Sequence, residues 1–157
     1  MNASKFFLKA ANSLITAVVA LFLILAAAYS GYALWDNAQV YAAVDDVQSE
    51  LMKLKPDPEQ KDGGASFEEL RKINPDVCGW ITLDHTKIDY PILQGEDNLT
   101  YIHTDVYGDF ALSGSIFLDS GCDNTFQGKY SLLYGHHMAN HKMFGDLDLY
   151  RKKKFFD

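Results

Sequence analysis

The sequence predicts a mainly β domain with helical insertions, preceded by a transmembrane helix and an amphipathic helix. Three observations support this fold class. An apolar block without charged residues occupies positions 14–35, and apolar residues then recur at helical spacing as far as position 54. Several short segments rich in β-branched and aromatic residues follow, separated by turns, a pattern typical of a β-barrel.

The apolar block is long enough to cross a membrane, because a helix over residues 14–35 spans about 33 Å. Lys5 and Lys9 precede the block and acidic residues follow it, so the positive-inside bias places the N-terminus in the cytoplasm. We expect a single-pass protein of the cell membrane. Residues 1–13 form its cytoplasmic N-terminus, residues 14–35 contact the lipid bilayer, and the remainder is extracellular.

A cleaved secretory signal is the alternative for this block, since residues 26–28 are alanines that would suit a cleavage site. The apolar run continues through Tyr29, Tyr32 and Trp35, which makes it longer than the roughly 7 to 15 apolar residues of a signal peptide. These aromatic residues also suit a membrane interface. An uncleaved anchor is therefore favoured.

Residues 36–66 predict an extracellular helix and a linker. Apolar residues follow one another at spacings of four or three and so share one helix face: Val40, Val44, Val47, Leu51 and Leu54. We expect this stripe to pack on the chain's own domain, with self-association as the alternative. The helix ends before Pro56, and the polar stretch 56–65, with two prolines and two glycines, predicts a linker or long loop.

The next segment predicts a short helix and then a β-hairpin. Ser66 and Glu69 form a capping box, Phe67 and Leu70 form the inner face, and the helix stops at 74–75, an Asn-Pro pair. Segments 80–83 and 88–93 have strand composition, and the polar segment 84–87 between them predicts the hairpin turn.

Four further elements complete the expected domain. Residues 97–102 predict a short helix capped by Asp97 or Asn98, and residues 114–119 predict a strand. The chain turns over 121–128 into an alternating strand that starts at Tyr130 and stops at Gly135. Helical spacing returns after residue 143.

The histidine that follows this strand, His136, is a candidate general acid or base. Its unperturbed pKa of about 6.5 lets an imidazole exchange protons near neutral pH. The net charge of −7 and the absence of a long basic cluster argue against a nucleic acid partner, since the three lysines at 152–154 are too few.

Five blocks in this order resemble class B sortases: 73–81 (INPDVCGWI), 88–92 (IDYPI), 97–98 (DN) with Tyr101, 114–119 (GSIFLD), and 134–138 (YGHHM) with 143–144 (MF). The resemblance covers residues 67–157, which it identifies as the N-terminal part of a sortase catalytic domain. It implies an incomplete sortase-type β-barrel.

The resemblance implies a membrane-anchored cysteine transpeptidase on the outer face of a Gram-positive bacterium. Such enzymes cleave the C-terminal sorting motif of a secreted protein, hold the acyl group as a thioester and pass it to an amine of a cell-wall precursor or a pilin. They need a cysteine, a histidine and an arginine, with no cofactor and no metal.

Residue by residue, the resemblance assigns His136 as the catalytic histidine. Its neighbour His137 is the less favoured alternative, because adjacent strand residues point to opposite faces. The resemblance places Asn98, Ile102 and Tyr134 in the groove for the sorting peptide. Asn98 and Ile102, four residues apart, would share one helix face, and strand alternation would put Tyr134 on the side of His136. Alternatively, Asn98 caps its helix and Ile102 is a core residue.

The cysteine and arginine of the family have no counterpart here, because they lie on later strands. Cys78 is expected to be a small buried hydrophobe, and Cys122 lies between carboxylates that would disfavour a thiolate. A disulfide between them is permitted outside the cell but not indicated. The two arginines, Arg71 and Arg151, do not match the catalytic position, so we expect this chain alone to be inactive.

Two other interpretations remain open. His136, His137 and His141, with His103 elsewhere, could supply imidazole ligands to a metal, although their spacing matches no common zinc motif. The chain could also be a non-catalytic, truncated sortase remnant anchored in the membrane.

Overall fold

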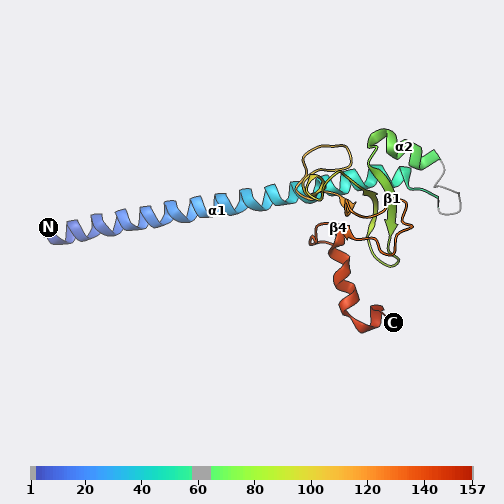
Figure 1. The fold of residues 1–157 in the computed structure, drawn as a ribbon. Helices are drawn as coiled ribbons and strands as arrows, with labels where there is room; N and C mark the ends of the chain where they lie inside the picture. Colours follow the sequence, from blue (N-terminus) through green and yellow to red (C-terminus); the bar gives the residue numbers. More distant parts are fainter. Residues whose placement is uncertain (1–2, 58–64, 157) are drawn as a thin grey trace. The chain divides into compact units, whose positions relative to one another are not determined.

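The computed structural model describes residues 3–57 and 65–156, and the chain divides into two compact units, residues 1–39 and 40–157. Helix α1 (Ala3–Leu51) is continuous through both units and is followed by the short 3₁₀ helix η1 (Met52–Leu54) (Figure 1). The sequence predicts an anchor helix and a separate amphipathic helix here. The two are one helix, because no glycine or proline lies between residues 32 and 51 to stop it.

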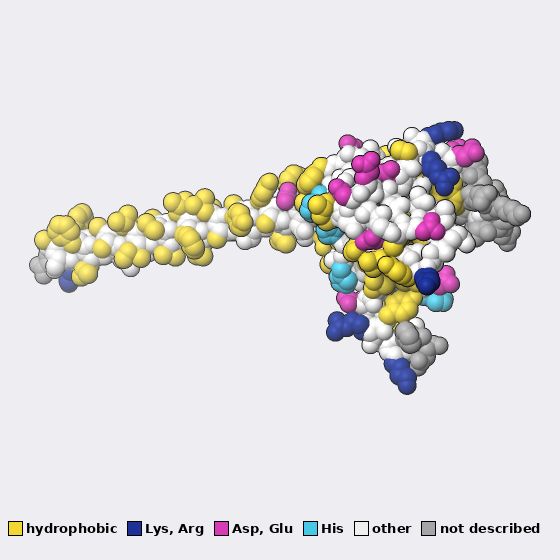
Figure 2. Space-filling view, viewed as in Figure 1, with side chains coloured by type: hydrophobic (Ala, Val, Ile, Leu, Met, Phe, Trp, Pro, Cys, Tyr) yellow, Lys and Arg dark blue, Asp and Glu magenta, His cyan; other side chains and the backbone are white. Residues whose placement is uncertain are grey.

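Residues 3–39 of α1 expose apolar side chains along the helix (Figure 2). The mean hydropathy of its most apolar 18-residue window is 2.3. By length and composition the helix could cross a membrane, although a signal sequence meets the same criterion.

The last part of α1, from residue 40 on, belongs to the second unit and packs within it. Val44 is buried in one apolar cluster and Leu51 in another, and Val47 and Leu54 pack against the cluster that contains Leu51. Polar contacts hold the segment as well: Gln48 Nε2 donates to the backbone oxygen of Lys87 at 3.3 Å. The prediction that this stripe packs on the chain's own domain is confirmed.

A mixed four-stranded sheet forms the centre of the second unit, in the order β1-β2-β3-β4. Its strands are β1 (Val77–Thr82), β2 (Asp89–Leu93), β3 (Ile116–Leu118) and β4 (Leu133–Tyr134). The pairs β1·β2 and β3·β4 are antiparallel, whereas β2·β3 is parallel. Strands in the described residues are fewer and shorter than a mainly β domain implies, and β1 and β4 form the two ends of the sheet.

The β1–β2 hairpin agrees with the prediction. The amide of Leu83 donates to the oxygen of Ile88 at 2.9 Å, and the hydroxyl of Thr86 donates to the oxygen of Leu83 at 2.6 Å. Helix α2 (Ala65–Ile73) precedes the hairpin and buries Leu70 completely, as predicted. The proposed capping box lies outside the described side chains, since that of Ser66 is not described.

The sheet has an apolar core on each face, because successive strand residues point to opposite sides. Ile116 and Leu118 pack with Val44 and Met143 in one cluster, whereas Phe117 belongs to a second cluster. The second cluster contains Leu51, Leu70, Val77, Leu93, Tyr101 and Val106. The short strand β3 therefore contributes to both cores.

Three predicted elements differ in the structure. The helix predicted over 97–102 is only the 3₁₀ helix η3 (Thr100–Ile102). The strand predicted from Tyr130 is reduced to β4, because β3 has three residues and pairs with only Leu133 and Tyr134. The final helical segment is the 3₁₀ helix η4 (Phe144–Arg151), followed by α3 (Lys153–Phe156).

Candidate active site

His136 lies just beyond β4, where close packing fixes its position. A side chain added at the preceding Gly135 would collide with Ile116 and Phe144. The backbone oxygen of His136 accepts a hydrogen bond from the amide of Phe144 at 2.9 Å. Because His136 is half-buried, its imidazole has contact with solvent as well as a defined place.

A second histidine, His103, lies beside His136. The ring centroids are 5.8 Å apart at an interplanar angle of 42°, and His103 in turn packs against the ring of Phe110 at 6.1 Å. The sequence suggests His103 only as a possible metal ligand and does not predict this contact with His136, since residues that follow a short 3₁₀ helix carry no periodicity that would reveal it.

His137 has different neighbours from His136. Its Nε2 lies 3.1 Å from Oδ2 of Asp148, a residue of η4, and both side chains are exposed. The two adjacent histidines therefore contact different parts of the domain, as expected for successive residues of an extended chain. His141 pairs with the buried carboxylate of Asp146, which belongs to η4 as Asp148 does.

Each of the histidines that a metal site would need has a different partner in the structure. Within residues 3–57 and 65–156, no three His, Cys, Asp or Glu side chains come close enough together to hold one metal ion. The structure thus gives no support to the metal interpretation of His136, His137 and His141.

Asn98 and Tyr134 meet at a single carboxylate, that of Asp119, just after β3. Asn98 Nδ2 donates to Asp119 Oδ2 at 2.7 Å, and the Tyr134 hydroxyl donates to the same oxygen at 3.0 Å. Asp119 lies in a block that the sequence analysis used for the family resemblance, but its side chain was not singled out. The only available signal was its position after a strand and before a turn.

The prediction that Asn98 and Ile102 share one helix face is wrong. Helix η3 starts at Thr100, so Asn98 lies before it and the four-residue helical spacing does not apply. Asp97 caps η3 by accepting bonds from the amides of Leu99 and Thr100. Ile102 is half-buried and packs against the apolar cluster that contains Leu70, which agrees with the alternative of a core role.

Both cysteines are free thiols in the structure. The thiol of Cys78 lies 3.4 Å from the backbone oxygen of Ile92, and burial raises the pKa of Cys78 to about 11. Such a thiol is almost entirely protonated at neutral pH. Cys122 packs against the cluster that contains Ile116.

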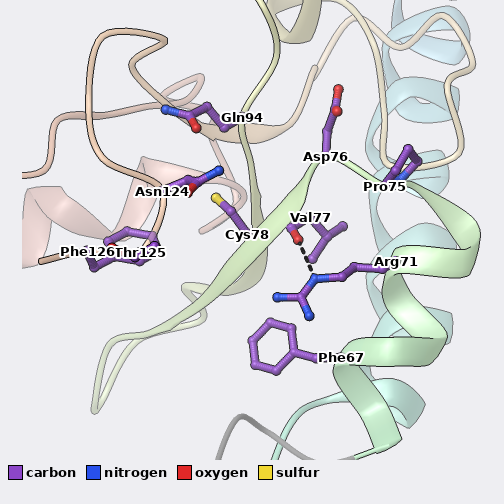
Figure 3. A pocket seen from close by; sticks show the side chains of 10 residues that line it. All are labelled: Phe67, Arg71, Pro75, Asp76, Val77, Cys78, Gln94, Asn124, Thr125 and Phe126. Carbon is purple, nitrogen blue, oxygen red and sulfur yellow. Dashed lines mark hydrogen bonds between the residues drawn. The ribbon is translucent and has the colours of Figure 1, made fainter.

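An open pocket of about 580 Å³ is lined by residues of α2, of the start of β1 and of the loop after Cys122. Figure 3 shows the side chains that line it. The thiol of Cys78 and the guanidinium of Arg71 line it. Arg71 Nε donates to the oxygen of Val77 at 3.2 Å, and the guanidinium carbon lies 5.4 Å from the centre of the Phe67 ring. None of the predicted site residues lines this pocket, and Arg71 supports the packing of α2 on β1.

No protein-family model matches the chain. The chain is similar to Sortase B of Listeria monocytogenes, with 36% identity over 129 residues that cover 80% of this chain and 51% of the Listeria protein. The chain thus spans about half the length of this curated relative.

Solved structures of class B sortases are also similar to the chain. The crystal structure of sortase B from Bacillus anthracis in complex with AAEK1 matches with a TM-score of 0.70 and 36% identity, over 75% of this chain and 58% of that chain. A Streptococcus pyogenes class B sortase involved in pilus biogenesis matches with a TM-score of 0.56 and 55% identity, over 59% of this chain and 51% of that chain.

Proposed function

The chain is a homologue of class B sortases that matches about half of their length, and from this premise we propose that it forms part of a sortase-type cysteine transpeptidase. The enzyme would cleave the sorting motif of a secreted protein, hold the acyl fragment as a thioester and transfer it to an amine of a cell-wall precursor or a pilin. The similarity to the streptococcal enzyme involved in pilus biogenesis leaves both acceptors in the proposal.

The observation that carries the proposal is the placement of His136. The residue stands immediately after β4, held by the close packing at Gly135 and by the bond from the Phe144 amide. In the proposed reaction its imidazole exchanges a proton with the attacking thiol and protonates the leaving amine. Both roles require a group that can accept and donate a proton and that remains accessible to substrate.

Asn98 and Tyr134 line the groove for the sorting peptide in this proposal. Their common contact with Asp119 supports a shared location, although they come from separate elements. Ile102 has the weaker support, because it packs against the core cluster around Leu70. Its remaining exposed surface would contact an apolar side chain of the peptide.

Neither Cys78 nor Cys122 serves as the nucleophile in this proposal. With a pKa of about 11, roughly one Cys78 thiol in ten thousand is ionised at pH 7. We propose that residues 1–157 do not cleave peptides by themselves, because the Cys78 thiol stays protonated at neutral pH and Cys122 packs against an apolar cluster. The alternative is a non-catalytic sortase remnant. Two cysteines that are unsuited to nucleophilic attack agree equally well with this alternative.

The apolar helix α1 supports a membrane anchor in this scheme. Residues 14–35 would lie in the bilayer with the lysines at 5 and 9 on the cytoplasmic side, and the second unit would work at the outer cell surface.

A chimaera tests the proposed function. Residues 1–157 are joined to the part of the streptococcal class B sortase that follows its matched region, and turnover is measured with fluorogenic peptides that carry sorting motifs of secreted proteins from the same genome. We expect turnover that depends on the supplied cysteine and persists in Cys78→Ala and Cys122→Ala variants. Turnover that Cys122→Ala abolishes would refute the assignment of the nucleophile, and a folded chimaera without turnover would favour the remnant.

A further inference from the structure

The carboxylate of Asp119 is the centre of a small hydrogen-bond network on the surface of the second unit. Its Oδ1 accepts the amide of Gly121 at 2.9 Å, while its Oδ2 accepts both Asn98 Nδ2 and the Tyr134 hydroxyl. The three donors come from a loop before η3, from the turn after β3 and from β4. Besides its local bond to Gly121, this side chain links the turn after β3 to two segments that are distant in the sequence, those of Asn98 and Tyr134.

The network determines which way the amide of Asn98 faces. Its Nδ2 donates to Asp119, and its Oδ1 accepts the amide of Ser120 at 2.7 Å. With one bond on each side, the amide plane cannot flip without losing both. Among the described residues, one N–H and one oxygen lone pair of Asn98 have no further partner, and together they are the complement of a single peptide group.

The network also determines which hydrogen bond Tyr134 can make with a bound peptide. Its one hydroxyl proton goes to Asp119, so the phenolic oxygen faces outward only as an acceptor. The Tyr134 ring packs against the Phe117 ring, with 5.2 Å between the two ring centroids. A fixed acceptor of this kind suits the N–H of an extended peptide.

The charge of Asp119 is maintained by its partners. Hydrogen bonds from the Gly121 amide, from the Tyr134 hydroxyl and from Asn98 lower the pKa of Asp119. The bond to Asp119 in turn raises the pKa of Tyr134 and keeps the phenol protonated. At neutral pH both groups thus stay in the protonation states that the network needs.

We propose that Asp119 is a positioning residue of the peptide groove, which orients Asn98 and Tyr134 for hydrogen bonds to the backbone of a sorting peptide. This inference rests on the proposed function. Asp119 itself does not touch the substrate, and its effect is on peptide affinity through the two side chains that it holds.

The first measurement tests the network in the full 157-residue chain, placed in lipid nanodiscs. Tyrosine labelled with ¹³C at the ζ carbon is titrated by NMR, with Tyr134→Phe used to assign the resonance. In Asp119→Asn we expect the pKa of Tyr134 to fall towards the ordinary tyrosine value, because the charge that raises it is gone. Asp123→Ala is the control, since Asp123 makes similar loop bonds to Thr125 without touching Tyr134. An unchanged Tyr134 pKa in Asp119→Asn would refute the network.

The second measurement uses fluorescein-labelled peptides that carry sorting motifs from the same genome, and determines their Kd for the same chain. We expect Asp119→Ala to weaken binding about tenfold, as for the loss of one to two oriented hydrogen bonds. Asp119→Asn, which keeps an acceptor oxygen, should recover most of the affinity, and Asp123→Ala should match wild type.

The outcomes separate this inference from the proposed function. If no peptide binds the wild-type chain, the proposed peptide groove is wrong. If peptides bind wild type and Asp119→Ala with the same Kd, the groove stands and the role of Asp119 is refuted.

Discussion

Replacement of Gly135 by alanine tests how the fold places His136. The added Cβ would collide with the Ile116 side chain and press on the Phe144 ring. The backbone at Gly135 does not have a positive φ, so the penalty comes from packing alone. Overpacking of this kind costs about 1–3 kcal/mol, and we expect a loss of unfolding free energy in that range.

The assay is urea unfolding of the chain in nanodiscs, followed by the fluorescence of Trp80 in β1. Gly128→Ala is the matched control, because a Cβ there would make only ordinary contacts, at 3.5 Å from the Tyr130 oxygen. Ile116→Val removes the atom that the added methyl group would strike, so the double variant should be more stable than the sum of the single effects predicts. A Gly135→Ala variant as stable as Gly128→Ala would refute this account of the site.

Three further outcomes are expected. Leu70→Ala should lower the unfolding free energy by about 2–5 kcal/mol, because Leu70 is fully buried. Met52→Ala, at an exposed position, should change it by less than about 0.5 kcal/mol. Equal effects of the two variants in urea unfolding would contradict the assigned core. In a variant that keeps only Cys78, the rate of alkylation by iodoacetamide should rise about tenfold per pH unit from neutral pH towards the thiol pKa of about 11. A rate that stops rising near pH ~8.5, the ordinary cysteine pKa, would show that the thiol is not buried. For Asp146, burial raises the pKa but the bond from the Lys87 amide and the pairing with His141 outweigh it, so the folded pKa is lowered. The ionised Asp146 carboxylate therefore stabilises the fold above the ordinary pKa of about 3.9, and this stabilisation is lost as pH falls through the lower folded pKa. An Asp146→Asn variant should have a lower unfolding free energy at neutral pH, and its unfolding free energy should depend less on pH in the acid range. An unchanged dependence of unfolding free energy on pH would contradict this.

Local sequence signals predicted the elements whose stability is decided by nearby residues. The hairpin over 77–93 combines β-branched strands with a polar turn, and its hydrogen bonds close within the turn itself. Helix α2 has a clear stop at its Asn-Pro pair, and its apolar face coincides with the buried Leu70. Such signals need no knowledge of distant partners.

Elements that depend on distant partners were predicted less well. The apolar alternation from Tyr130 suggests a long strand, but a strand is only as long as its neighbour allows, and β3 offers two paired positions. In the same way, nothing local distinguishes a 3₁₀ turn from an α-helix over 97–102, where Asp97 caps a single turn.

The candidate site shows the same division. Asn98, Tyr134 and His136 follow from the family resemblance, whereas the network around Asp119 depends on loops that come together only in the folded chain. A carboxylate after a strand is common, and its partners lie 21 and 15 residues away in the sequence. The sequence therefore indicates the residues but not the carboxylate that joins them.

The most direct test of the catalytic assignment compares His136→Ala with His137→Ala in the chimaera described above. Loss of a general acid–base group lowers turnover about 10²–10⁴-fold, so we expect a loss of this size in kcat for His136→Ala with unchanged thermal stability. His137→Ala, which removes only the exposed contact with Asp148, should retain activity within about threefold, since surface ion pairs contribute little. Full turnover in His136→Ala, or a comparable loss in His137→Ala alone, would contradict the account.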